Sequence, residues 1–111
     1  MSNIIVMGEC MVEFGRAGEA NLYKKSFAGD VFNTGIYIKR CVKDLANVKF
    51  LTAVGKDNIS GELLTMMGKE SLDTSLVYQS STEQMGLYLI NVDSEGERSF
   101  TYWRSTSAAK Q

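Results

Sequence analysis

The sequence contains no histidine and only two cysteines, Cys10 and Cys41, in 111 residues. These scarcities exclude a zinc site and a nucleophilic triad built on histidine, because both need side chains that the sequence does not supply. Any chemistry must instead use carboxylates, tyrosine, arginine, lysine or backbone amides. So few cysteines also favour reduced thiols and a cytoplasmic protein.

The sequence also lacks a strong excess of positive or negative charge, and it has no long hydrophobic run. The 12 basic residues are balanced by 13 acidic ones, the formal net charge is −1, and no run of basic residues occurs. We therefore expect neither nucleic acid nor an anionic membrane as a partner. No stretch approaches the length of a membrane span, and residues 1–3 lead into an apolar segment without the charged region of a signal peptide.

The sequence does have enough apolar material for one folded domain, with 44% hydrophobic and 10% aromatic residues. Residues 4–8 form a continuous apolar run ending in glycine, which is typical of a buried strand in an α/β sheet. No G-x-G-x-x-G pattern follows. Residues 9–14 and 22–27, separated by a loop, instead indicate an extended excursion that leaves the main sheet and returns.

A Gly-Asp turn then leads directly into a helix within residues 27–40. Gly29 lets the backbone approach a ligand closely, Asp30 can cap the helix, and Asn33 lies one turn further on. A polar small molecule could bind at this helix start, although an ordinary capped helix after a loop is the alternative. The apolar stripe expected to fix the helix on the sheet consists of Val31, Gly35, Ile38, Val42 and Leu45.

The middle of the chain has a βαβ rhythm, which predicts a parallel sheet. Residues 48–55 are typical of a second buried strand, residues 60–69 of a helix, and residues 72–78 of a third short strand. Asp57, Asn58 and Ser60 offer caps for this helix. The apolar face expected to pack in the core carries Ile59, Leu63, Met66 and Met67.

The last third of the chain predicts a β-hairpin, because residues 86–92 and 97–104 flank a turn sequence in which Gly96 suits a left-handed position. A three-residue loop at residues 94–96 pairs Asp93 with Glu97. Counting back along both strands then fixes the register of the whole hairpin.

In this register Tyr88 lies opposite Tyr102. Because side chains alternate along a strand, these two phenols and the guanidinium of Arg104 share one face. Such a face could be a convergent polar patch or simply the solvated surface of a hairpin.

These pieces, in this order, resemble the ribokinase-like (PfkB) carbohydrate kinases, and within that family the kinases of 2-keto-3-deoxygluconate. The resemblance covers the whole chain and is carried by residues 6–13, 27–34, 54–61, 72–75 and 86–104. It implies a ribokinase-like α/β fold in which a parallel sheet with flanking helices is joined by a β-lid formed by the two extended excursions. The core would comprise residues 1–9 and 28–79, and the lid about 10–27 and 85–104.

The resemblance also implies that residues 1–111 are the N-terminal portion of a single domain whose C-terminal portion is absent. The nucleotide pocket and the catalytic base lie in that later portion of the family, so we expect no catalytic residue and no metal site in this chain. ATP and Mg²⁺ are expected for the full-length enzyme, without tight binding to this fragment. Asp30 is not assigned as the base, because its surroundings match the family's early motif rather than its later Gly-Ala-Gly-Asp motif.

The family's substrate contacts can be transferred to matching positions. The substrate-binding residues implied are Gly29, Asp30, Asn33, Tyr88, Tyr102, Arg104 and, less directly, Glu13. The planar guanidinium of Arg104 suits bidentate binding of a sugar-acid carboxylate. There are two alternatives: another PfkB kinase such as a fructokinase, and a non-catalytic sugar-binding or dimerising module. The family also implies a homo-oligomer formed through the lid.

Overall fold

The structure is a computed structural model that describes residues 2–111, with side chains for all of these except residues 19 and 20. It has nine regular elements and two short 3₁₀ helices, Lys43–Leu45 and Ala108–Lys110. In chain order the elements are β1 (Ser2–Met7), β2 (Met11–Ala17), β3 (Glu19–Ala28), α1 (Asp30–Val42), β4 (Ala46–Val54), α2 (Asn58–Lys69), β5 (Val77–Gln79), β6 (Leu87–Val92) and β7 (Arg98–Trp103).

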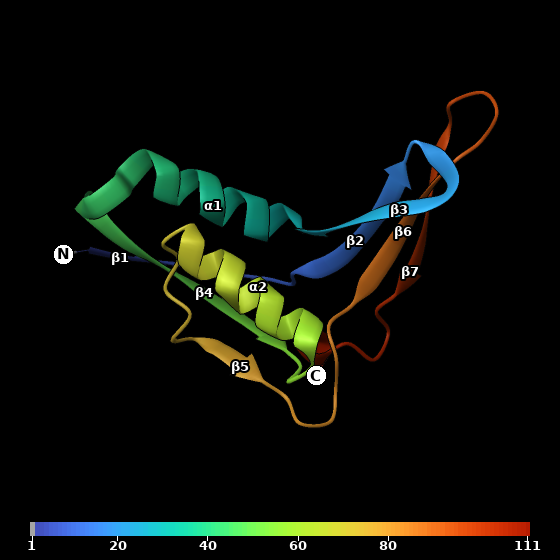
Figure 1. Cartoon of the computed structure of the whole chain (residues 1–111). Helices are drawn as coiled ribbons and strands as arrows, with labels where there is room; N and C mark the ends of the chain where they lie inside the picture. Colours follow the sequence, from blue (N-terminus) through green and yellow to red (C-terminus); the bar gives the residue numbers. More distant parts are fainter. Residues whose placement is uncertain (1) are drawn as a thin grey trace.

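Strands β1, β4 and β5 form a parallel sheet in the order β1-β4-β5, which we call the core sheet. Helices α1 and α2 lie together against it (Figure 1). Phe32 of α1 meets Phe50 of β4 with ring centroids 5.8 Å apart. The buried apolar cluster consists of Val6, Cys10, Phe32, Val48, Phe50, Val54, Leu63, Met67 and Leu72. The predicted parallel sheet with packed helices is confirmed.

The opposite face of the core sheet is exposed, whereas the apolar run at residues 4–8 predicted a strand buried on both faces. Met7 is 70% exposed and Tyr78 67%, while Val6, which points to the helices, is buried. Both helices lie on one side, so alternate side chains of β1 and β4 have no cover. The exposed apolar face is formed by Ile5, Met7, Leu51 and Tyr78.

Strands β3, β2, β6 and β7 form a second, mixed sheet in that order, which we call the projecting sheet because it extends away from the helices in Figure 1. Strand β2 pairs antiparallel with β3 and parallel with β6. The predicted departure of the extended segments from the main sheet is confirmed. The return strand is longer than expected, since it begins at Glu19 after a tight turn at Gly18, whose φ is 90°.

Helix α1 differs from expectation at both ends. Asp30 does not cap it, because the N-cap is Gly29 and no side chain accepts a capping hydrogen bond. Leu45 does not continue the apolar stripe but is 84% exposed. The positive φ of 51° at Lys43 ends the α-helix, and residues 43–45 form a 3₁₀ turn that leads directly into β4. Phe32, which the stripe omitted, is the large buried side chain of this helix.

Helix α2 follows the sequence expectation. The Asp57 side chain caps it by accepting a hydrogen bond from the Ser60 amide at 3.2 Å. Leu63 and Met67 are fully buried. The third strand is shorter than predicted: β5 covers only Val77–Gln79, and an isolated bridge joins Asp73 to β4. No helix within residues 2–111 is long and apolar enough to cross a membrane.

Candidate functional site

The hairpin of β6 and β7 brings two tyrosines together as the loop register predicted. Tyr88 pairs with Tyr102, and their ring centroids are 5.6 Å apart. The Asp93 amide donates to the Glu97 carbonyl at 3.0 Å, and Gly96 has a φ of 83°, so the predicted three-residue loop is confirmed. A residue other than glycine would have a strained backbone at this position.

Glu13 joins this face from the neighbouring strand β2, where it lies beside Tyr88. The Tyr88 hydroxyl donates to Glu13 Oε1, and Ser26 Oγ donates to Oε2 at 3.1 Å. Burial of the phenol, together with this carboxylate, raises the pKa of Tyr88 well above its ordinary value. Tyr88 therefore stays protonated at neutral pH and can act as a hydrogen-bond donor.

Helix α1 begins directly after β3, whose Ser26 pairs with Glu13, the residue that binds Tyr88. The charge of Asp30 is also among the causes that raise the pKa of Tyr88. Asp30 and Asn33 are exposed, and the Asn33 amide donates to the Gly29 carbonyl at 2.8 Å as the helix begins. Gly29 allows a close approach, but to the protein itself: a Cβ there would lie 2.6 Å from the Glu9 carbonyl oxygen.

Arg104 shares the tyrosine face as predicted, with its guanidinium carbon 5.9 Å from the centre of the Tyr102 ring. Its charge is not free, however. Arg104 Nη2 donates to Glu9 Oε1 at 2.8 Å, and Ser107 Oγ donates to Glu9 Oε2 at 2.8 Å. Arg104 Nε is buried without a hydrogen-bond partner among residues 2–111.

Sequence reasoning missed the role of Glu9. Its signal was present, because Glu9 follows the glycine at the carboxyl end of β1, the end at which α/β sheets place their functional groups. Glu9 thus lies between two predicted parts of the site: its carbonyl oxygen is next to Gly29 and its carboxylate binds Arg104. The sequence analysis treated Glu9 only as part of an extended segment.

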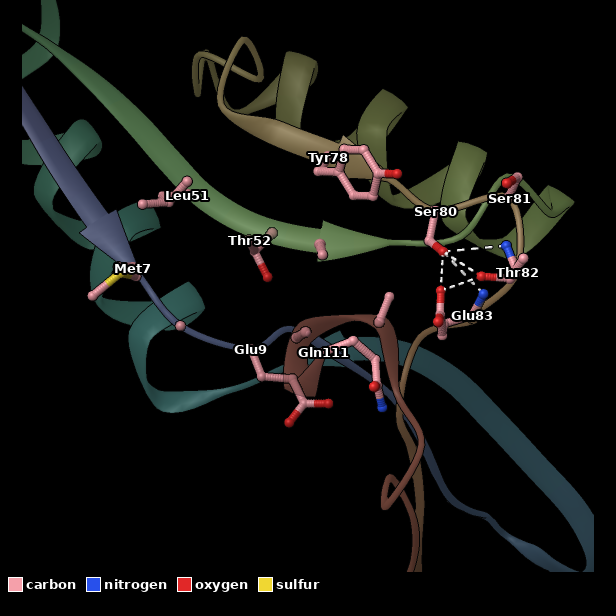
Figure 2. Close-up of a pocket in the computed structure, with 14 residues that line it drawn as sticks. Met7, Glu9, Leu51, Thr52, Tyr78, Ser80, Ser81, Thr82, Glu83 and Gln111 are labelled. Atoms are coloured by element: carbon pink, nitrogen blue, oxygen red, sulfur yellow. Dashed lines mark hydrogen bonds between the residues drawn. The ribbon is translucent and has the colours of Figure 1, made fainter.

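A separate hollow of about 810 Å³ lies between the carboxyl ends of the core strands and the last residues of the chain (Figure 2). The Ser80 hydroxyl accepts from the Thr82 and Glu83 amides at 3.2 and 3.0 Å and donates to the Glu83 carboxylate. Thr52 Oγ1, also on its wall, is buried without a partner among residues 2–111. Glu9 lines this hollow too.

Within the described side chains, no group of three acidic or cysteine residues could hold a metal ion. Both cysteines are free thiols, Cys10 buried and Cys41 exposed. Burial, helped by the charge of Glu9, raises the pKa of Cys10 to about 12. This thiol therefore stays protonated and is a core residue rather than a nucleophile.

Over residues 1–111 the sequence matches the pfkB family of carbohydrate kinases. The chain belongs to this family. Two of its curated relatives are named 2-dehydro-3-deoxygluconokinase: one from Dickeya dadantii, 42% identical over 97% of this chain and 34% of the relative, and one from Escherichia coli K12, 44% identical over 96% and 34%. A third relative, from Haemophilus influenzae, carries the same name and is 37% identical over 99% of this chain and 35% of the relative. The chain thus spans about a third of the length of these relatives.

Solved pfkB-type structures have the same fold. The fructokinase from Vibrio cholerae O395 superposes with a TM-score of 0.87 at 24% identity, over 98% of this chain and 36% of that one. The ATP-bound fructokinase from Xylella fastidiosa superposes with a TM-score of 0.85 at 21% identity, over 96% of this chain and 32% of that one. At these identities the likeness establishes the ribokinase-like fold, which confirms the predicted fold class.

Proposed function

We propose that this chain carries the sugar-binding part of an ATP-dependent kinase that phosphorylates 2-keto-3-deoxygluconate. The observation that carries this proposal is the gathering of Glu13, Tyr88, Tyr102 and Arg104 on one face of the projecting sheet, with Glu13 paired to β3, the strand that leads into α1. The relatives named 2-dehydro-3-deoxygluconokinase support the choice of substrate.

In this proposal each group matches a part of a keto sugar acid. The Tyr88 hydroxyl, whose proton goes to Glu13, accepts from a sugar hydroxyl, and the Tyr102 hydroxyl and the Asn33 amide bind hydroxyl or keto oxygens. Gly29 and the exposed Asp30 at the start of α1 complete the sugar site. The Arg104 guanidinium meets the carboxylate. Hydrogen bonds to an ionised group are roughly twice as strong as neutral ones, so this contact separates sugar acids from neutral sugars.

ATP and Mg²⁺ belong to the complete enzyme in this proposal, and we expect neither to bind this chain tightly. The first turn of α1 carries the carboxylate of Asp30, which repels a phosphate from that helix start. The 111-residue chain itself should therefore release no ADP in a coupled assay with 2-keto-3-deoxygluconate; turnover that copurifies with the chain would contradict this.

A fructokinase is the second candidate, favoured by the fold neighbours of that name. Arg104 separates the two candidates. Arg104→Ala should weaken binding of 2-keto-3-deoxygluconate about 10- to 100-fold, the equivalent of a lost charge-assisted contact of about 1.5–3 kcal/mol, and should change binding of fructose little.

Isothermal titration with both sugars measures this difference. Arg104→Lys should recover only part of the affinity, because an ammonium cannot reproduce the bidentate geometry. Equal losses for both sugars, or no loss for either, would remove the support for a sugar acid. A chain that binds neither sugar would favour the third reading, a non-catalytic dimerising module.

A further inference from the structure

Four segments of chain enter or leave the projecting sheet on the side of the core sheet and its helices, and each approaches Glu9. Glu9 itself lies in the first, between β1 and β2. In the second, between β3 and α1, a Cβ at Gly29 would lie 2.6 Å from its carbonyl oxygen. In the third, before β6, a Cβ at Gly86 would lie 2.6 Å from its Oε2. In the fourth, Arg104 and Ser107 both donate to its carboxylate at 2.8 Å.

Glu9 explains why two of these segments carry a glycine where they approach it. Neither Gly29 nor Gly86 can carry a side chain without displacing Glu9, so the backbone of both segments is held against it. The Glu9 side chain is only 11% exposed, and its two oxygens receive one charged and one neutral donor. A nearly buried carboxylate that accepts a hydrogen bond at each oxygen has little freedom to move.

The ion pair also determines how Arg104 is presented. Nη2 is engaged by Glu9, and the guanidinium carbon is held 5.9 Å from the Tyr102 ring centre. The Arg104 side chain remains 38% exposed, so the group that Glu9 orients is still accessible from solvent. Without the carboxylate, the long arginine side chain would recover several rotatable bonds.

We propose that Glu9 is a positioning residue that acts through Arg104: its carboxylate fixes the guanidinium on the tyrosine face in the orientation that receives the sugar-acid carboxylate. This inference rests on the proposed function, in which Arg104 meets that carboxylate. It adds a specificity determinant at the junction of the two sheets, outside the set of residues that touch the sugar.

The variant that tests this is Glu9→Gln, which keeps the shape of the side chain and removes its charge. Its matched control is Glu70→Gln, because Glu70 binds Arg40 through two guanidinium nitrogens, Nε and Nη2, in the last turn of α1, the opposite end of that helix from its junction with β3. Glu9→Asp serves as the conservative variant, since it restores the charge on a shorter stem.

The first measurement follows the arginine side-chain N–H signals by ¹⁵N nuclear magnetic resonance and needs no ligand. In the wild-type chain the Arg104 signals should exchange slowly with water. Glu9→Gln should speed this exchange at least fivefold at Arg104 only, whereas Glu70→Gln should do so at Arg40 only. Unchanged Arg104 exchange in Glu9→Gln would overturn the proposal.

The second measurement is the dissociation constant for 2-keto-3-deoxygluconate, determined by isothermal titration. Glu9→Gln should weaken binding roughly tenfold, as expected for loss of an oriented charge-assisted contact. Glu9→Asp should recover part of this, and Glu70→Gln should have no effect. In the Arg104→Ala background Glu9→Gln should have no further effect.

Two outcomes of the binding measurement would overturn the proposal. An affinity that rises in Glu9→Gln would show that Glu9 competes with the ligand for Arg104, and full additivity with Arg104→Ala would show that Glu9 acts independently. If the wild-type chain does not bind the sugar acid, the proposed function fails, while the exchange measurement still decides whether Glu9 orients Arg104.

Discussion

At the scale of single residues, the hydroxyl of Thr52 is a buried polar group that lowers stability. Thr52 Oγ1 is buried without a partner among residues 2–111, and such a hydroxyl costs about 1–3 kcal/mol. Thr52→Val, which removes it at nearly constant shape, should therefore raise the free energy of unfolding by about 1 kcal/mol in urea denaturation. Thr101→Val is the control, because its hydroxyl accepts from Asn91 at 3.2 Å, and it should give no gain. A destabilised Thr52→Val would show that the hydroxyl does have a partner in solution.

Asp73 makes the stability depend on pH. Hydrogen bonds from Ser75 and Asn47 lower the pKa of Asp73 from 3.8 to about 2. A lowered pKa stabilises the fold fully above pH 3.8, and this contribution is lost as the pH falls towards 2. Asp73→Asn should therefore show a shallower fall in melting temperature between pH 4 and pH 2 than the wild type, measured by circular dichroism. Parallel curves for the two proteins would contradict the assignment.

At the scale of elements, the cap of α2 is the local interaction that most clearly fixes a helix end. Asp57 accepts from the Ser60 amide, and Ser60 Oγ, itself fully buried, donates to Asp57 at 2.8 Å. Asp57→Ala should lower the free energy of unfolding by about 1–2 kcal/mol, because the cap and the partner of a buried hydroxyl are lost together. Asp57→Asn keeps an acceptor and should lose less than half of this. Equal stability of all three proteins would show that the cap contributes nothing.

Elements whose geometry is set by local chemistry were predictable from sequence, and those set by distant contacts were not. The hairpin register followed from the loop length and Gly96, and the α2 cap from Asp57. Leu45 was misassigned because periodicity alone does not reveal the positive φ at Lys43 that ends α1. The Glu9–Arg104 pair joins residues 95 positions apart, a contact that no local pattern encodes.

At the scale of the whole molecule, two surfaces favour association. The first is the exposed face of the core sheet, where β1 is also an edge strand without a single charged or proline residue to discourage pairing. The second is on the projecting sheet, where Phe100 is 48% and Tyr102 50% exposed. We propose that two copies of the chain form a homo-oligomer through this second surface at Phe100, an exposed aromatic residue that extends the tyrosine face from Tyr102 towards the hairpin loop and is not among the residues assigned to the sugar.

These two surfaces can be separated by placing a charge on each. At tens of micromolar the chain should sediment as species larger than its 12.3 kDa monomer, because exposed apolar patches of this kind associate. Phe100→Lys should reduce a discrete dimer, since a buried lysine without a partner is unfavourable, whereas Met7→Lys should reduce only larger aggregates that form through the core sheet. Sedimentation velocity resolves the two size classes in one experiment. A dimer that survives Phe100→Lys but disappears with Met7→Lys would place the interface on the core sheet, and a wild-type chain that sediments only as monomer would contradict both assignments.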